Sequence, residues 1–190
     1  MKTKLISNLV ENILTNNFNY VWSKQGLGMM RAYINDNLRL HIWHRDLIVP
    51  KVSSIHTHPF SFKSYIVCGS LQNINYLESN NGLPTHKKQL IQCGANGCLI
   101  GEPTFIKLVR NNVKTYSNGD TYKQDSNEIH TVNFLDGTVT LCDRTFNKDT
   151  ESAFVYYDRL QNFVDAKPTT ATPEEVKKYT DAALNMLINC

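Results

Sequence analysis

The first sixteen residues place apolar side chains on one side of a helix. Leu5, Leu9, Val10 and Ile13 recur at the spacing of an amphipathic α-helix, with lysine, serine and asparagine between them. We therefore expect the chain to begin with a helical segment, and we assign residues 1–34 to it.

The middle of the chain changes to short runs of β-branched and aromatic residues, interrupted by Gly, Asn and Asp. Such runs predict many short strands with few helices between them, which favours a β-sandwich or barrel over about residues 38–158. The expected strands are Leu38–Trp43, Val52–His58, Ser64–Cys68, Gln72–Leu77, Phe105–Val109, Asn127–Asn133, Thr138–Arg144 and Ala153–Asp158. The glycine-containing stretch from Asn80 to Glu102 is expected to form loops or a hairpin.

The last segment has a clear helix start signal. Thr172 stands at the N-cap, Pro173 at the first helical position and Glu175 at the capping-box position. An apolar stripe follows, formed by Val176, Tyr179, Ala183, Met186 and Leu187. We predict a C-terminal helix over residues 172–188 that packs on the outside of the β core, and one domain spanning residues 1–190.

Composition agrees with an ordinary globular domain. The 190 residues are 41% hydrophobic and 19% charged, and the net charge of +3 does not indicate a nucleic-acid partner. No apolar run is long enough to span a membrane, and polar residues interrupt the first eight positions too soon for a secretory signal. The odd number of cysteines, five, favours reduced thiols. We expect a cytoplasmic protein without a membrane partner.

Three histidines are candidate metal ligands. His56 and His58 lie two residues apart, so on a strand they would point to the same face. His130 lies on a second apolar run, far away in sequence. Three imidazoles that leave coordination positions open suit Fe(II), Mn, Ni, Cu or Zn. The alternative is that they are buried structural residues.

The intervals around these histidines resemble those of the cupin superfamily. Its first motif is Gly, five residues, His-x-His, three or four residues, Glu, six residues, Gly, and His56, His58 and Gly69 fall on it. Its second motif is Gly, five residues, Pro-x-Gly, two residues, His, and Gly119 and His130 fall on it. The resemblance implies a mainly β, cupin-type double-stranded β-helix (a jelly-roll barrel) with helical N- and C-terminal additions. It also implies a homodimer as one assembly state.

The departures from these motifs change the expected ligand set. Phe62 occupies the position of the usual glutamate ligand, so a metal site here would hold three histidines without a carboxylate. Pro50 replaces the first glycine, and Asp125 and Asn127 replace the Pro-x-Gly turn.

A three-His site is typical of the thiol dioxygenases, the cysteine-dioxygenase-like group, which residues 38–144 resemble. That resemblance implies Fe(II) as the cofactor, with Zn, Mn or Ni as alternatives. In that group an arginine before the His-x-His pair holds the substrate carboxylate, and Arg31 lies at a corresponding distance. Lys63 and Arg144 stand near the positions of the mammalian-type cysteine–tyrosine crosslink, which therefore has no counterpart here. As cations they are further candidates for substrate binding.

Tyr122 and Glu128 flank the second motif and are candidate catalytic residues. Glu128 precedes His130 by two positions, so strand alternation would turn it inward as a fourth ligand or as an acceptor for an imidazole N–H. An exposed charge at a sheet edge is the competing interpretation. For Arg31, Lys63 and Arg144 the alternative is a structural or surface ion pair.

These residues lead to three functional hypotheses, a main one and two alternatives to it. The first is a mononuclear non-haem iron dioxygenase that acts on a small anionic substrate, a thiol or a carboxylate. The second is a non-catalytic cupin that binds or sequesters a small anionic or nucleotide-like ligand. The third is a sugar isomerase or epimerase in which a histidine is the general base.

Overall fold

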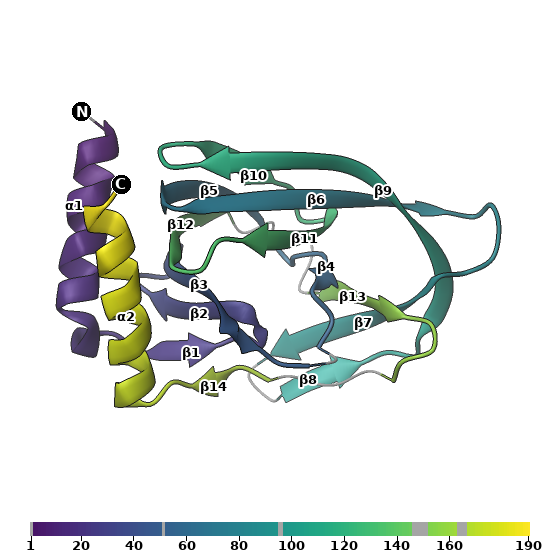
Figure 1. The fold of residues 1–190 in the computed structure, drawn as a ribbon. Helices are drawn as coiled ribbons and strands as arrows, with labels where there is room; N and C mark the ends of the chain where they lie inside the picture. Colours follow the sequence, from purple (N-terminus) through teal and green to yellow (C-terminus); the bar gives the residue numbers. More distant parts are fainter. Residues whose placement is uncertain (1, 51, 95–96, 146–151, 163–166) are drawn as a thin grey trace.

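The computed structural model describes residues 2–50, 52–94, 97–145, 152–162 and 167–190, which form two antiparallel β-sheets and two terminal helices (Figure 1). The helices are α1 (Lys2–Thr15) and α2 (Pro173–Ile188), with a short 3-10 turn, η1, at Asn17–Asn19. The first sheet has the order β10 (Thr121–Gln124), β5 (Ser61–Cys68), β12 (Thr138–Thr145), β3 (Leu38–Ile48), β2 (Leu27–Tyr33), β1 (Trp22–Lys24), β14 (Thr169–Thr170). The second has the order β13 (Ser152–Asp158), β4 (Ile55–His56), β11 (Ile129–Phe134), β6 (Ser70–Ser79), β9 (Thr104–Ser117), β7 (His86–Gly94), β8 (Gly97–Ile100).

The strand order is that of a double-stranded β-helix. Strand β3 pairs with β12, β4 with β11, β5 with β10 and β6 with β9, so successive strands pair with partners in reverse order along the chain. One long antiparallel ribbon is thereby wound into two sheets, which is the jelly-roll arrangement. An additional β13–β7 pairing closes part of the second sheet into a ring. The prediction of a mainly β, jelly-roll fold with terminal helices is confirmed.

The predicted N-terminal helical segment is wrong beyond Thr15. Residues 22–24 and 27–33 are strands β1 and β2, which extend the first sheet. The physical reason is a two-residue period in β2: Met30 and Ala32 are buried toward the helices, whereas Met29 and Arg31 line a cavity between the sheets. A helix would scatter these side chains around its axis.

The other strand predictions differ mainly in their ends. The predicted strand Val52–His58 is reduced to β4, β9 continues to Ser117, and β10 was not predicted. The stretch from Asn80 to Glu102 contains the β7–β8 hairpin, as one of the two expected alternatives.

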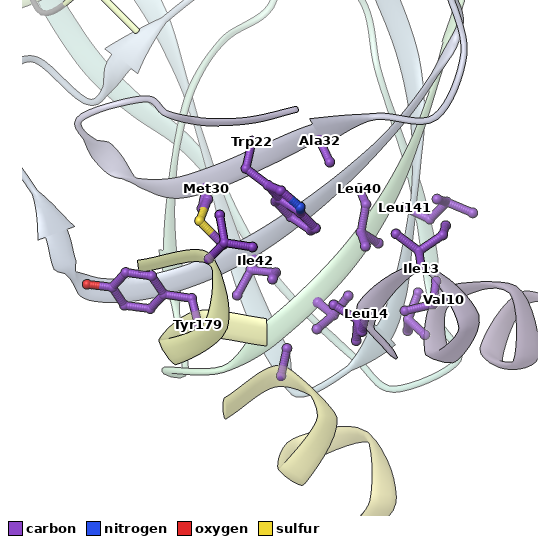
Figure 2. Close-up of a cluster of buried hydrophobic side chains, with 14 of the residues drawn as sticks. Val10, Ile13, Leu14, Trp22, Met30, Ala32, Leu40, Ile42, Leu141 and Tyr179 are labelled. Atoms are coloured by element: carbon purple, nitrogen blue, oxygen red, sulfur yellow. The ribbon is translucent and has the colours of Figure 1, made fainter. Parts of the chain in front are cut away.

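The two helices cover the outer face of the first sheet. Buried side chains from α1, α2 and the outward positions of β1–β3 and β12 form one apolar cluster, shown in Figure 2. Its fully buried members include Val10, Ile13, Met30, Leu40 and Ile42. This cluster packs on the outer face of the first sheet, and the inner face of that sheet lines the space between the two sheets.

The start of α2 is as predicted. The Thr172 hydroxyl accepts a hydrogen bond from the Glu175 backbone N–H at 3.3 Å, and the Glu175 carboxylate accepts one from the Thr172 N–H at 2.9 Å. Val176, Tyr179 and Ala183 then bury their side chains in the cluster behind the first sheet. Among the described residues, neither helix is long and apolar enough to cross a membrane.

The turn at Gly69 can be tested by a matched pair of substitutions. Gly69 has φ +82°, and a Cβ there would lie 2.4 Å from Thr138 Oγ1, which bonds to both Ser70 N and Ser70 O. Gly119 has φ +86° with nothing near its Cβ position. We expect Gly69→Ala to lower the free energy of unfolding by about 2 to 4 kcal/mol, against about 1 to 2 kcal/mol for Gly119→Ala. Urea unfolding of both variants measures this, and equal losses would contradict the close contact with Thr138.

Candidate metal centre

Backbone pairing brings together the three histidines that are far apart in sequence. His56 on β4 is the register partner of His130 on β11. His58 lies just after β4. Its backbone N–H donates to the Ser126 carbonyl at 3.1 Å, and the backbone N–H of Thr57 donates to the Phe154 carbonyl at 2.9 Å. His58 is therefore positioned by these backbone hydrogen bonds and not by strand alternation.

The three imidazoles present nitrogen atoms to one small volume. One ring nitrogen from each of His56, His58 and His130 lies within 4.8 Å of the other two. His58 Nε2 and His130 Nε2 are 2.9 Å apart. His130 is buried, and the other two are half-buried. Three nitrogen donors at this separation, on the wall of a cavity, are a donor set that fits one divalent transition-metal ion.

Hydrogen bonds at Nδ1 orient two of the rings. His130 Nδ1 lies 2.7 Å from Asn73 Oδ1, and the Asn73 amide nitrogen donates to Gln124 Oε1 at 2.9 Å. The Asn73 oxygen is therefore the acceptor, and His130 carries its proton on Nδ1. His56 Nδ1 similarly lies 2.9 Å from the Ser54 carbonyl oxygen. Both histidines are left with a lone pair on Nε2, which is the arrangement found in metal-binding histidines.

The environment keeps all three imidazoles neutral. Burial lowers the pKa of His130 well below its usual value, and nearby His56 lowers it further. Burial also lowers the pKa of His58 well below its usual value, with added repulsion from His56, His130 and Arg39. Burial lowers the pKa of His56, against the opposing effect of its hydrogen bond to the Ser54 carbonyl. Neutral imidazole is the form that binds metal.

Phe62 occupies the position of the glutamate in the cupin motif, and a second aromatic residue, Phe60, lies beside it. The Phe62 ring makes an edge contact with the His58 ring, with centroids 4.9 Å apart, and the Phe60 ring lies 5.4 Å from it. Within the described residues, the cluster of potential ligands contains no carboxylate. The three-His ligand set implied by Phe62 therefore agrees with the geometry.

The histidines open into a cavity of about 350 Å³ between the two sheets. This volume is at the lower end of the range for small-molecule sites. Its walls are largely apolar and aromatic, formed among others by Leu27, Met29, Trp43, Phe60 and Val132. The first sheet contributes positively charged side chains to the cavity wall, namely Arg31 on β2 and Arg39 on β3.

Two of the predicted substrate-binding cations lie at or near the cavity, and one does not. Arg31 lines it, as the resemblance implied. Arg144 lies close behind, 5.0 Å from the centre of the Phe60 ring, and donates to the Asp36 carbonyl. Lys63 is a correction: its ammonium lies over the Tyr65 ring beside α1. Phe62 faces the cavity, and strand alternation turns Lys63 away from it.

Of the two predicted catalytic residues, one lines the cavity and the other does not. Tyr122 is buried and lines the cavity, and burial raises the pKa of its hydroxyl, which stays protonated. The expected inward position of Glu128 is a correction. Its side chain is exposed, and its carboxylate accepts a hydrogen bond from the Asp125 N–H at 2.9 Å. Glu128 precedes the first residue of β11, so strand alternation does not apply to it.

The sequence reasoning missed Asn73 and did not choose Arg39 as a site residue. Arg39 shares one strand face with His41 and Trp43, and all three line the cavity, so alternation along β3 was a usable signal. Asn73 had no such signal, because its role depends on β6 lying beside β11, where Val132 is its register partner.

Comparisons with known proteins show only distant likenesses. The chain matches no protein-family model, and it matches no curated protein. Among solved structures it is similar to a variant of oxalate decarboxylase from Bacillus subtilis, with a TM-score of 0.32 and 14% identity over 72% of this chain and 30% of that one. A second Bacillus subtilis oxalate decarboxylase structure, from work on its Mn(II) centres, has a TM-score of 0.31 and 13% identity over 73% of this chain and 30% of that one. Drosophila melanogaster CENP-C bound to CAL1 gives 0.29 and 13% over 76% and 100%.

The chain thus spans 30% of the length of the oxalate decarboxylases that it matches. At this level of similarity the matches do not identify a relative. The fold assignment rests on the strand order, and the site rests on its own geometry.

Proposed function

We propose that this protein binds one divalent transition metal through His56, His58 and His130, and that the metal is iron(II). We further propose that the protein is a mononuclear dioxygenase for a small anionic substrate. The observation that carries the proposal is the convergence of three neutral imidazoles, within 4.8 Å of one another, on a cavity that is also lined by Arg31 and Arg39. Zn, Mn and Ni suit the same donors.

The chain's own residues would position the reactants. Asn73 and the Ser54 carbonyl hold two imidazoles with Nε2 free, and Phe60 and Phe62 keep the immediate surroundings apolar. Arg31 and Arg39 would hold the anionic group of the substrate, and protonated Tyr122 can donate a hydrogen bond to it. Iron bound there supplies the one-electron chemistry with O2 that the side chains lack. For a thiol the overall balance is R–SH + O2 → R–SO2H, with both oxygen atoms on sulfur.

Oxygen consumption tests this proposal. Iron-loaded protein should consume O2 when given small thiols or carboxylates, and it should yield one sulfinate per O2 if a thiol is the substrate. His58→Ala, which removes one imidazole, should neither retain iron nor consume O2. If protein produced with supplemented iron contains none, or if it contains iron and consumes no O2 with any small anion, the dioxygenase proposal is wrong.

A binding protein without turnover is the second candidate. It is favoured by Arg31 and Arg39, which can hold an anion whether or not a metal is present. In that case a small anion should be recovered chemically unchanged from purified, heat-denatured protein. Conversion of that anion by the iron-loaded protein in air would instead support the dioxygenase.

The hydrogen bond from His130 to Asn73 provides a test of the metal site apart from activity. We expect Asn73→Ala to weaken metal binding by about 10- to 100-fold, because the His130 ring loses the acceptor that orients it. The control is Asn133→Ala on β11, an exposed residue whose side-chain amide donates to Gln72 Oε1, away from the histidines. Competition with a chromogenic chelator measures both affinities. Equal affinities in the two variants would show that Asn73 does not position the ligand.

A further inference from the structure

Arg31 and Arg39 are held in place by aromatic rings. The guanidinium carbons of Arg31 and Arg39 lie 4.9 Å and 4.6 Å from the centre of the Tyr33 ring. Arg39 is also 4.9 Å from the centre of the Phe60 ring, so it lies between two aromatic faces. Stacking of this kind orients the planar group and leaves its N–H edges available for hydrogen bonds.

Within the described residues, no acidic group neutralises these two arginines. The described residues that line the cavity include no aspartate or glutamate. In the part of the chain that the structure describes, neither Arg31 nor Arg39 has a carboxylate within ion-pair distance, and the Nε atoms of both are buried without a hydrogen-bond partner. Buried charges are normally paired, so this arrangement indicates a missing counter-charge.

The charge to be balanced is larger than one. Burial lowers the pKa of Arg39 to about 10, with repulsion from Arg31 and Arg144 adding to it, and the group still stays charged at neutral pH. Arg31 and Arg39 together carry two positive charges, and Arg144, 5.6 Å from the centre of the Tyr33 ring, has polar contacts of its own, among them the Asp36 carbonyl. Burial and the three arginines lower the pKa of His41 well below its usual value, so that ring is neutral and adds no charge. A single carboxylate would leave an excess of positive charge in a buried space.

A phosphate monoester matches the charge and the shape of the groups present. It carries a charge of about −1.5 to −2 at neutral pH and offers three acceptor oxygens. Guanidinium groups bind such oxygens in pairs, through two parallel N–H donors. The neutral His41 ring lies beside the arginines, and its Nε2 is buried without a partner, so it adds one more nitrogen to the polar side of the cavity.

We propose that Arg31 and Arg39 form a subsite for a phosphate monoester, so that the ligand of this cavity is a small organophosphate. The proposal rests on the proposed function only in assigning the ligand's other end to the three histidines. Phe60 joins the two regions, because its ring contacts both Arg39 and His58. The apolar wall formed by Met29 and Trp43 would hold the carbon portion of the ligand.

Calorimetric titration with inorganic phosphate, acetate and succinate at matched ionic strength tests the subsite. Phosphate should bind wild-type protein at least about 10-fold more tightly than acetate or succinate. Arg39→Gln and Arg31→Gln should each weaken phosphate binding about 10- to 100-fold, as expected for lost charge-assisted hydrogen bonds. The matched control is Arg45→Gln on the same strand, an exposed arginine paired with Asp136 outside the cavity. It should leave phosphate binding unchanged.

Folding of the variants is checked in phosphate-free buffer. Each substitution relieves the repulsion between Arg31 and Arg39 and also removes ring stacking, so the two effects oppose each other and the variants should remain folded. If Arg39→Gln fails to fold, Arg39→Lys keeps the charge and removes the planar pair of donors, and phosphate should then bind about 10-fold more weakly. Equal phosphate affinity in Arg39→Gln (or in the lysine variant) and Arg45→Gln would overturn the subsite. Acetate or succinate binding to the wild type as tightly as phosphate would overturn its assignment to a phosphate.

Repeating the titration with His130→Ala separates this proposal from the metal proposal. Phosphate affinity within about two-fold of wild type in that variant supports the arginine subsite, because a metal then contributes nothing to binding. Loss of phosphate binding in His130→Ala, with retention in Arg39→Gln, would place the anion on the histidine side and overturn the subsite. If the wild type binds metal but no phosphate, the metal site stands and the phosphate subsite is wrong. If it binds phosphate but no metal, the phosphate subsite stands and the metal site is wrong.

Discussion

Alanine at His130 is expected to abolish metal retention. The variant removes the only buried member of the three-His group and also leaves Asn73 Oδ1 without its partner. Because loss of a residue that merely orients a ligand weakens metal binding about 10- to 100-fold, loss of the ligand itself should exceed about 100-fold. Elemental mass spectrometry of protein purified without chelator measures metal per chain in the variant and in the wild type.

His86→Ala is the matched control for this experiment. His86 begins β7 and has its Nδ1 2.8 Å from the Thr85 hydroxyl, outside the three-His group. It should retain wild-type metal content. Thermal unfolding must show that His130→Ala is folded, since an unpaired buried acceptor costs about 1 to 3 kcal/mol. Metal content equal to the control in a folded His130→Ala protein would refute the site.

Leu40→Ala is expected to lower the free energy of unfolding by about 2 to 5 kcal/mol, the range for removing a leucine side chain from a packed core. Leu40 is fully buried in the cluster between the first sheet and the two helices (Figure 2). Its neighbours Arg39 and His41 point to the opposite face and line the cavity. The substitution should therefore reduce stability while metal content at 20 °C, well below melting, stays unchanged.

Leu77→Ala on β6 is the control for the stability measurement. Leu77 is 55% exposed, and its truncation should change the free energy of unfolding by no more than about 0.5 kcal/mol. Urea denaturation of both variants gives the comparison. A Leu40→Ala protein as stable as Leu77→Ala would show that the helices do not pack on the first sheet in this way.

Local sequence patterns predicted the elements whose causes are local. The capping residues Thr172 and Glu175 specified the start of α2, because the side chain of each accepts a hydrogen bond from the backbone N–H of the other. Gly69 and Gly119, which fall on the two cupin motifs, both have the positive φ that glycine adopts without strain. The two-residue spacing of Arg39, His41 and Trp43 agrees with their common inward face on β3, where all three line the cavity.

Errors arose where local pattern and strand boundaries disagreed. Glu128 was expected to face inward by strand alternation, yet it lies in the turn before β11. Lys63 was chosen from its position in the family resemblance, and it faces outward from β5. In a strand, a shift of one residue moves a side chain to the other face of the sheet. Because Glu128 lies at the boundary of β11, an error in the predicted start of that strand was enough to misplace its side chain.

By itself, the sequence determined that the chain has a core of many short strands, helices near both ends and three histidines at the intervals of a metal site, while its resemblance to the cupins implied the jelly-roll arrangement. Tertiary structure alone decided that His56 becomes the register partner of His130, that Asn73 reaches His130, and that Arg31 and Arg39 share the Tyr33 ring. Each of these contacts joins different strands, in two cases far apart in sequence. Their geometry depends on strand register and sheet packing, which the periodicity of any one segment does not encode.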